Sequence, residues 1–471
     1  MEKNKTYLLA SILVMLALLS LSPQVAAQEE SIESLTESVD GLGTALTFIW
    51  LLLCGGLVFL MHAGFSLVEA GFTRAKNTAN ILMKNMMTIC LGVLIYWLVG
   101  WAIMYGDADV PDVAGIFAFS QFCMSGADNS VWNAWFFQMV FAATGATIVS
   151  GAMAERTNFK AYLVFTGLLV AIIYPVYGHW VWSGTDLALL SGDGSWIVQM
   201  CGANFHDFAG SGVVHSIGGY AALAGVIILG PRLGKFKNGL PQVIPGHNIT
   251  FGFLGVLLLW LGWLGFNGGS TLDGSDAFMN LAVANTFLAA AAGAVAAMIL
   301  TWIKTGKPDP SLTANGVLAG LVAITAPCGS VENWAAIVIG LVAGVIVYAG
   351  VMFNEAVLKV DDPVGAIAVH GYCGTWGLLA VGIFSVGMGT GILDGAVYAA
   401  GAPGLLYGGV NQFIIQVVGA LAAIVWAFVM GLIVFKLIDV VIGLRVSERE
   451  ELEGLDITEH GIRAYPEYIT E

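Results

Sequence analysis

Two histidines lie in matched copies of one sequence pattern, and each copy belongs to a segment apolar enough to cross a membrane. One copy runs from Asp207 to His215 and the other from Asp362 to His370; in each, Gly follows Asp by three residues, Val by seven and His by eight. Ionisable groups inside a bilayer are costly, and they mark ion or proton pathways. The matched pair therefore predicts a duplicated protein with a conduction site near the bilayer midplane.

Aromatic side chains form a second group of candidates at the ends of three apolar segments. They are Phe137 and Phe141, which share a helix face at a spacing of four, then Trp182, and then Trp263, Phe266 and Ser270 at i, i+3 and i+7. Aromatic rings hold a desolvated cation through their quadrupoles, for about 2 kcal/mol or more, and a serine oxygen accepts a hydrogen bond from it. Two phenyl rings below such a cup would close an apolar constriction that favours a neutral molecule over a hydrated ion.

The same residues have plainer interpretations, which the sequence leaves open. Aromatic residues at helix ends commonly form interfacial belts, the expected role of Trp132 and Trp135. Asp207 suits a helix N-cap as well as it suits a binding site. Asp362 precedes Pro363 and favours a cap, because proline suits the first helical position. A single buried His is usually a packing group, and the matched pair argues against that role here.

Composition places the chain in a membrane and excludes other classes. Of 471 residues, 58% are hydrophobic and 10% are charged, whereas soluble proteins carry about 25% charged residues. A net charge of −15 disfavours nucleic acid as a partner. The six cysteines have no CxxC pair or metal-ligand spacing. We expect six free, buried thiols, with a pair between Cys123 and Cys201 as the alternative.

Eleven apolar stretches approach the roughly 20 residues of a spanning helix. They are 44–72, 80–105, 132–154, 160–182, 208–230, 249–269, 278–303, 313–329, 333–353, 364–386 and 405–436. Lys and Arg follow the odd-numbered stretches, as Arg74, Lys76 and Lys84 follow the first, and none follows the even-numbered ones. The positive-inside rule then places the N-terminus outside and the C-terminus inside.

The chain divides into four parts on these grounds. Residues 1–27 read as a signal peptide cleaved after Ala27, with an uncleaved first helix as the alternative. Residues 28–43 form an extracytoplasmic N-terminus, 44–436 the transmembrane domain, and 437–471 a cytoplasmic tail. Within the domain, five helices at about 44–230 and five at about 249–386 form repeats, and 405–436 is a final helix. Because five is odd, the two repeats are inverted.

The inverted repeat brings the histidines together. Asp207 opens its helix at the outer face and Asp362 opens its helix at the inner face. Each His lies eight residues further, about 12 Å along a helix. In a hydrocarbon core about 30 Å thick, roughly 6 Å then separates their levels. The fold class is an all-α membrane protein in which two imidazoles meet at the centre.

Several stretches together resemble the ammonium transporter (Amt/Mep/Rh) family, on the Amt side. The most specific are GAMAERTNFKAYLVF, DFAGSGVVHSIGG, LGWLGFNGGS, DDPVGAIAVHGYCG and the tail motif ELEGLDITEHG. The resemblance covers nearly all of the mature chain. It implies eleven helices in an inverted five-plus-five arrangement, a homotrimer with one pore per subunit in the plasma membrane, ammonium or ammonia as substrate, and no cofactor.

The resemblance also implies roles for the candidates. An outer recruitment site is matched by Trp182, Phe141 and Ser270, with support from Asp207. A phenyl gate is matched by Phe141 and Phe266. The twin histidines are matched by His215 and His370, with Trp263 and Phe137 lining the pore. Ammonium would lose its proton at the cup and pass as ammonia, with net charge movement. The chain departs from the pattern at Gly365, where some members have a third aspartate, in a long loop between Trp182 and Asp207, and at Ile462 in the tail.

The tail resembles a regulatory segment. In the family it docks on the inner face of the trimer, couples the subunits and helps to bind a PII-type nitrogen regulator. Thr458 lies in a tail motif whose threonine is phosphorylated in some relatives. A solvated, unmodified tail is the alternative.

Three other functions stay open at this stage. An ammonium sensor is disfavoured because sensors of the family append signalling domains, and this chain ends about 35 residues after its last helix. A neutral-gas channel for ammonia or carbon dioxide is disfavoured by the cation cup of Trp182 and Ser270. An intramembrane metalloenzyme on His215 and His370 lacks the third ligand that catalytic zinc sites usually have.

Overall fold

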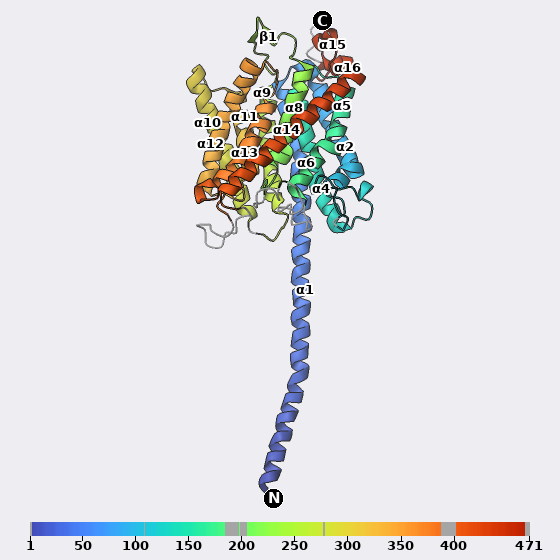
Figure 1. The fold of residues 1–471 in the computed structure, drawn as a ribbon, viewed down its shortest axis with the longest axis vertical. Coiled ribbons are helices and arrows are strands. Elements are labelled where there is room, and N and C mark those ends of the chain that lie inside the picture. The colour runs from blue at the N-terminus through green and yellow to red at the C-terminus, as the bar shows by residue number, and fades with distance from the viewer. Residues whose placement is uncertain are drawn as a thin grey trace.

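The protein is an almost entirely helical bundle, seen in a computed structural model (Figure 1). The structure describes residues 2–107, 109–183, 197, 205–276, 278–387 and 402–466. Most of the loop between Trp182 and Asp207, including Cys201, therefore lies outside the described residues.

The first half of the bundle contains one pair of short strands besides its helices. Its elements are α1 (Glu2–Phe72), η1 (Ala75–Asn77), α2 (Thr78–Ile95), η2 (Tyr96–Gly100), α3 (Trp101–Met104), η3 (Phe122–Met124), α4 (Asn129–Ala152), α5 (Phe159–Leu168), η4 (Leu169–Ile173), α6 (Tyr174–Trp182), η5 (Ser211–Ser216), α8 (Ile217–Leu229), β1 (Phe236–Lys237) and β2 (Leu240–Pro241). The two strands pair antiparallel in the loop that joins the halves.

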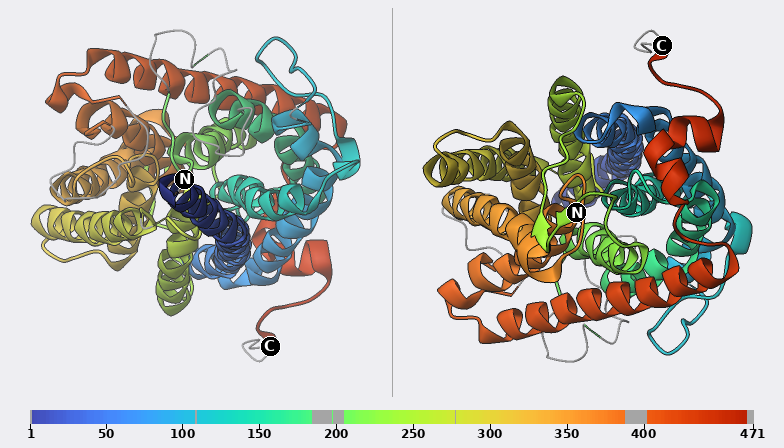
Figure 2. Two further views of the ribbon diagram at one scale, coloured as in Figure 1. Left: turned by 90° about the horizontal axis from the view of Figure 1, so that it is seen from below. Right: turned by 90° about the horizontal axis from the view of Figure 1, so that it is seen from above.

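The second half ends in a long helix and the tail. Its elements are α9 (Ile249–Trp263), η6 (Leu264–Gly268), η7 (Gly269–Thr271), α10 (Met279–Thr305), α11 (Pro310–Thr325), α12 (Asn333–Phe353), η8 (Asn354–Leu358), η9 (Ile367–Tyr372), α13 (Cys373–Phe384), η10 (Leu405–Tyr407), α14 (Val410–Val441), α15 (Glu448–Glu453) and α16 (Leu455–His460). Helix α14 runs along one side of the bundle (Figure 2), where it contacts α5, α8 and α13.

Ten helical segments among the described residues are long and apolar enough to cross a membrane. The one remaining predicted stretch, 313–329, corresponds to α11, an apolar helix of 16 residues. All eleven stretches are therefore helical, and one is shorter than a usual span. The chain is a multi-pass membrane protein, while the count of eleven spans and the orientation stay predictions.

Short polar residues start several helices. The carboxylate of Asp128 accepts hydrogen bonds from the backbone of the first turn of α4, and the Asn158 amide oxygen does the same for α5. Asp309 caps α11, whose first residue is Pro310. These side chains satisfy N–H groups that have no partner inside the helix.

Helix α1 continues without interruption from Glu2 to Phe72, and its N-terminal part projects away from the bundle (Figure 1). Residues 2–27 are thus continuous with the first spanning helix. Cleavage after Ala27 stays a prediction.

The two repeats cross where the histidines lie. Helix α8 packs against η9 and α13 packs against η5, so the helix after each His contacts the turn that carries the other. Two glycines allow this crossing: a Cβ on Gly219 would lie 2.2 Å from the backbone nitrogen of Gly371. The two half-sites therefore make reciprocal contacts, each with the helix that follows the other.

This close approach gives a stability prediction. Gly219→Ala should separate the two helices and cost about 1–3 kcal/mol, the usual range for overpacking. The control is Gly56→Ala, an exposed position in α1 where a Cβ meets nothing within 4 Å. The melting temperature of purified protein measures both, and an unchanged value for Gly219→Ala would contradict the crossing.

Two details correct the sequence-based expectations. The five described cysteines are free, but Cys90 and Cys123 are exposed rather than buried. Lys84, counted with the basic residues that follow the first helix, lies inside α2 and is 1% exposed. Its charge is part of the protein interior.

Candidate functional site

His215 and His370 meet inside the bundle. Their Nδ1 atoms lie 3.1 Å apart, their ring centroids 5.2 Å apart, and both side chains are buried. One Nδ1 must carry a proton and donate it to the other, because a neutral imidazole has one donor and one acceptor nitrogen. Nε2 of His215 has no hydrogen-bond partner. The predicted pair is thus present and directly hydrogen-bonded.

Each His lies on a π-helical turn, η5 for His215 and η9 for His370. These wider turns begin the two helices at the same position of the repeat, η5 before α8 and η9 before α13, and such turns often occur at functional sites. The sequence pattern predicted a regular helix that starts at each Asp. Instead η5 starts at Ser211, four residues after Asp207, so the helix is regular over only part of that interval.

Both aspartates cap these turns. Asp207 accepts hydrogen bonds from the backbone nitrogens of Gly210, Gly212 and Val213 at 2.8–3.0 Å. Asp362 repeats the arrangement at η9. Asp207 also connects to the aromatic cup, because its backbone carbonyl accepts a 2.8 Å hydrogen bond from Nε1 of Trp182.

Gly365 occupies the position at which some family members have a third aspartate. Its φ is +80°, and its counterpart Gly210 in the first repeat has φ +109°. Residues other than glycine rarely adopt these left-handed backbone angles. Glycine therefore lets the chain turn from each capping Asp into the π-helical turn.

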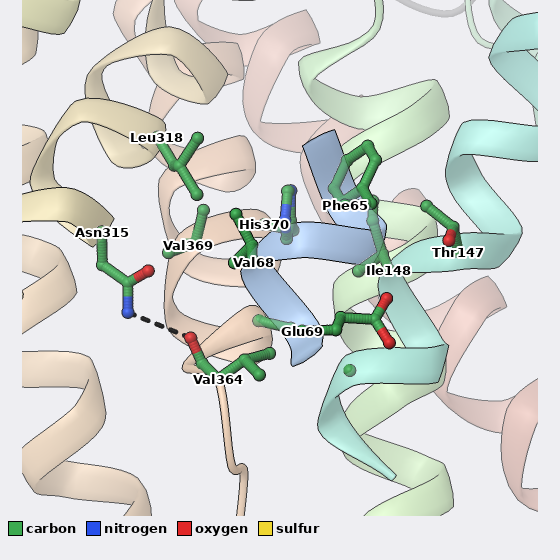
Figure 3. A pocket seen from close by; sticks show the side chains of 12 residues that line it. Phe65, Val68, Glu69, Thr147, Ile148, Asn315, Leu318, Val364, Val369 and His370 are labelled. Carbon is green, nitrogen blue, oxygen red and sulfur yellow. Dashed lines mark hydrogen bonds between the residues drawn. The ribbon is translucent and has the colours of Figure 1, made fainter. Parts of the chain in front are cut away.

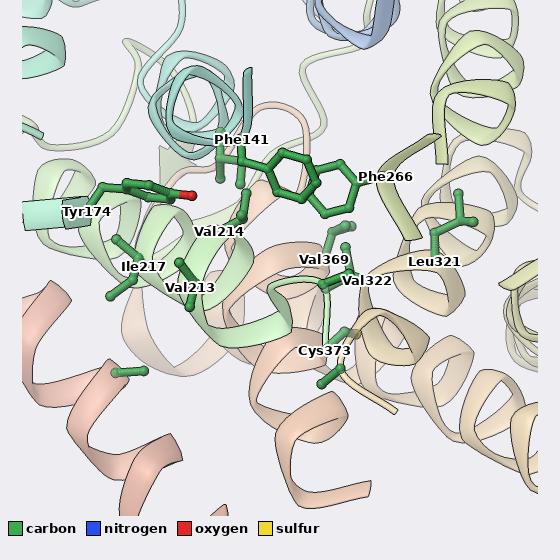
Figure 4. Packing of buried hydrophobic residues seen from close by; sticks show 14 of the residues in the cluster. Phe141, Tyr174, Val213, Val214, Ile217, Phe266, Leu321, Val322, Val369 and Cys373 are labelled. Atoms are coloured by element: carbon green, nitrogen blue, oxygen red, sulfur yellow. The ribbon is translucent and has the colours of Figure 1, made fainter. Parts of the chain in front are cut away.

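Phe141 and Phe266 form a stacked pair (Figure 4). Their ring centroids lie 4.1 Å apart at an interplanar angle of 29°, and both rings are buried. Phe137 lies 4.7 Å from Phe141, ring to ring, and Trp182 lies 6.3 Å from it. The predicted aromatic residues thus gather from α4, α6 and η6.

A continuous column of rings leads from this pair to the histidines. The His215 ring stacks on Phe266 at 5.4 Å and on Trp263 at 5.2 Å. Trp263 is fixed by a 2.9 Å hydrogen bond from its Nε1 to the Thr325 hydroxyl. The order along the column is Phe141, Phe266, His215 and His370.

A small cavity lies on the far side of the phenyl pair from the histidines. Its volume is about 10 Å³, counted as the space open to the centre of a water molecule, which is close to the minimum for one water. The lining residues, called the cup below, are Phe137, Gln138, Phe141, Trp182, Phe208, Ser270 and Leu272. The Ser270 hydroxyl donates to the Phe266 carbonyl at 2.7 Å and keeps its lone pairs for a ligand.

Sequence analysis missed Gln138 and Phe208 in the cup. Gln138 is 6% exposed, and its Oε1 has no hydrogen-bond partner. Gln138 follows Phe137 directly, and its place in the site is recognisable only when the helix face that contacts the phenyl pair is known.

A second cavity lies beyond His370 (Figure 3). Phe65, Glu69 and Thr147 line one side of it, and Asn315, Val364 and His370 belong to the other lining residues. None of these residues except His370 was a candidate from the sequence. The available signal was Glu69 itself, an ionisable residue within an apolar segment.

Buried ion pairs join the loops at the end of the bundle that carries the tail, called the tail end below. The Arg232 guanidinium makes two hydrogen bonds to the Asp361 carboxylate at 2.8 and 3.0 Å and one to Glu155 at 2.8 Å. Burial alone would raise the pKa of the Asp361 carboxyl, but the charges of Arg156 and Arg232 outweigh it and hold that pKa well below its usual range. Arg74 also pairs with Glu155.

The tail docks on these loops instead of lying free in solvent. Glu451 accepts a hydrogen bond from the Leu233 backbone at 2.7 Å, and Asp456 accepts one from the Asn80 backbone at 2.9 Å. The ring of His460 lies 4.9 Å from Phe159. Thr458 is partly buried in α16 and donates to the Gly454 carbonyl. The solvated-tail alternative is therefore wrong for the described part of the tail.

No three His, Cys, Asp or Glu side chains come together as a metal site anywhere in the part of the chain that the structure describes. The histidine pair thus has no third ligand of that kind among these residues.

Comparisons with known proteins agree on one family. The model of the Ammonium Transporter Family matches residues 49–465. Ammonium transporter Amt2 of Archaeoglobus fulgidus is 47% identical over 96% of this chain and 95% of its own length, and a putative ammonium transporter of Synechocystis is 41% identical over 90% of each chain.

Solved structures give the same result. A structure entitled "Sensor Amt Protein" superimposes with a TM-score of 0.80 at 36% identity, covering 89% of this chain and all of that one. Mep2 of Candida albicans superimposes with a TM-score of 0.76 at 26% identity, covering 86% and 87%. The two sequence relatives are named as ammonium transporters and one of the two structures as a sensor, and ammonium transport is the function that the comparisons support. The chain belongs to the ammonium transporter family.

Proposed function

We propose that the protein takes up ammonium at the cup, removes its proton there and conducts ammonia past Phe141 and Phe266 along His215 and His370. The observation that carries this proposal is the continuous column of rings from the cup to the histidine pair. Buried aromatic rings and the Ser270 oxygen stabilise a desolvated cation, while the stacked phenyl pair leaves no room for a hydrated one.

Deprotonation follows from the same surroundings. Burial favours the neutral form of an amine with a pKa near that of lysine. Potassium has no proton to leave behind, so the apolar constriction selects against it. The histidine pair has one bridging hydrogen bond and offers a donor and an acceptor to a passing ammonia. We propose that it also relays the proton, which gives net charge movement into the cytoplasm.

The cellular setting is part of this proposal. The cup faces outward and the tail end faces the cytoplasm, in agreement with the distribution of Lys and Arg. The protein is a homotrimer in the plasma membrane, with a signal peptide removed after Ala27. The docked tail couples the subunits, carries Thr458 as a modification site and contributes to a surface for a PII-type nitrogen regulator.

Current measurement on reconstituted protein tests the function. A jump in ammonium concentration should evoke an inward current in proteoliposomes on a solid-supported membrane, and an equal potassium jump should evoke none above that of empty liposomes. Equal currents for the two ions would contradict the selectivity argument.

The second candidate function is an ammonium sensor, favoured by the likeness to a structure entitled as a sensor. A sensor that conducts little would bind ammonium and give no current in the same experiment. A neutral-gas channel would give gas flux without competition by ammonium-like cations such as methylammonium.

A further inference from the structure

The cavity beyond His370 contains a buried carboxylate with one free oxygen. Glu69 is 2% exposed. Its Oε2 accepts a 2.7 Å hydrogen bond from the Ser150 hydroxyl, and its Oε1 has no hydrogen-bond partner. A buried oxygen of a charged group is unfavourable when it has no hydrogen-bond partner. Such a group points to a ligand that the structure does not contain.

Neighbouring polar groups are already engaged. The Asn85 amide donates to the Ile81 carbonyl at 3.1 Å, and its oxygen accepts from the Thr147 hydroxyl at 2.6 Å. On the opposite side, Asn315 donates to the Val364 carbonyl at 3.0 Å, as Figure 3 shows. None of these bonds reaches Oε1 of Glu69.

Lys84 is the charged group that faces Glu69 from α2. Its ammonium donates to the Ser150 carbonyl at 2.9 Å and lies 5.2 Å from the centre of the Tyr162 ring. Among the described ion pairs there is none that joins Lys84 directly to Glu69. The lysine therefore balances the carboxylate at a distance and leaves Oε1 free to bind another cation.

The cavity continues the column of rings. Phe65 lies 6.1 Å from His370, ring to ring, and Glu69 follows one helical turn later on α1, about 6 Å further towards the tail end. The volume of the cavity, counted in the same way, is about 20 Å³, which is enough for one small molecule. A species that leaves His370 thus enters a space lined by a phenyl ring, a hydroxyl and a carboxylate.

We propose that this cavity is an inner binding site for ammonium, in which Oε1 of Glu69 accepts a hydrogen bond from the ion and the Phe65 ring contacts it. This inference rests on the proposed function. Ammonia that leaves the histidine pair takes up the proton that the pair relays, and ammonium forms again. The Glu69 carboxylate stabilises that ion before it leaves.

The first test removes the charge and keeps the shape. Glu69→Gln retains an acceptor for Ser150 and should lower the ammonium-evoked current about 10-fold, which corresponds to about 1.4 kcal/mol. The control is Glu332→Gln, which neutralises a partly exposed carboxylate bonded to the Trp334 side chain and should leave the current unchanged. The wild-type current is the reference: its absence would refute the proposed function, not the inner site alone.

A second variant separates binding from folding. Glu69→Gln leaves Lys84 without a balancing charge, so the protein is expected to lose stability. The double variant Glu69→Gln/Lys84→Met removes both charges and should recover the melting temperature. If the carboxylate binds ammonium, its current stays about 10-fold low despite the restored fold. A double variant that folds and conducts within about twofold of wild type overturns the proposal, because the two charges would then be purely structural.

Discussion

Replacing both His215 and His370 by alanine is expected to abolish the ammonium-evoked current. Positioned proton-transfer groups contribute about 10²–10⁴-fold to a rate, so the double variant should lose at least about 10²-fold if the pair relays the proton. The 3.1 Å contact between the two Nδ1 atoms is the structural reason. The measurement is the current on an ammonium jump, with reconstituted protein quantified in the same liposomes.

A third buried histidine supplies the control for this experiment. His179 is 2% exposed, and its Nδ1 lies 2.7 Å from the Met104 carbonyl. His179→Ala removes an imidazole of equal size outside the column of rings and should leave the current within about twofold of wild type, as expected for a group without a role in proton transfer. An undiminished ammonium-selective current in the His215→Ala/His370→Ala variant would refute the relay.

The duplicated pattern predicted the centre of the site well. The matched eight-residue spacing from Asp to His predicted that His215 and His370 meet, and their Nδ1 atoms lie 3.1 Å apart. Helical periodicity likewise placed Phe137 and Phe141 on one face, and the structure stacks Phe141 on Phe266.

The sequence pattern did not predict the backbone conformation at the histidines. Spacing alone does not distinguish an α-helical turn from a π-helical one, so the turns η5 and η9 were not predicted. The left-handed backbone angles of Gly210 and Gly365 were not predicted for a similar reason. Glycine is common in membrane helices because it allows close packing. A single sequence therefore does not distinguish a glycine needed for a left-handed angle from one needed for packing.

The inner cavity was missed for a different reason. Glu69 lies a few residues before the basic cluster that starts at Arg74, and Lys84 was counted with that cluster. A charge near the end of an apolar stretch is normally solvated or interfacial. Only the packing of α1 against α2 and α4 shows that both groups are buried.

Asp361→Asn is expected to have the largest effect on stability. Asp361 is fully buried, bonds to Arg232 and receives a 2.6 Å hydrogen bond from Arg156 at its backbone carbonyl. Removal of one partner from a buried ion pair costs about 3–5 kcal/mol, because the remaining charge is left uncompensated. The melting temperature at neutral pH should fall accordingly. Lys436→Ala, which breaks the exposed pair with Asp439, should cost less than about 1 kcal/mol.

The acid limb of the stability profile gives an independent check on Asp361. Its pKa in the folded protein is lower than its ordinary value, so the unfolded chain binds the proton more readily. The stabilisation is fully present above the unfolded pKa of about 3.9 and is lost as the pH falls from there towards the folded value. Asp361→Asn removes this dependence, so the variant should lose less stability than wild type between about pH 5 and pH 2. Parallel acid limbs for the two proteins would show that Asp361 is not the group that ties the loops of the tail end together.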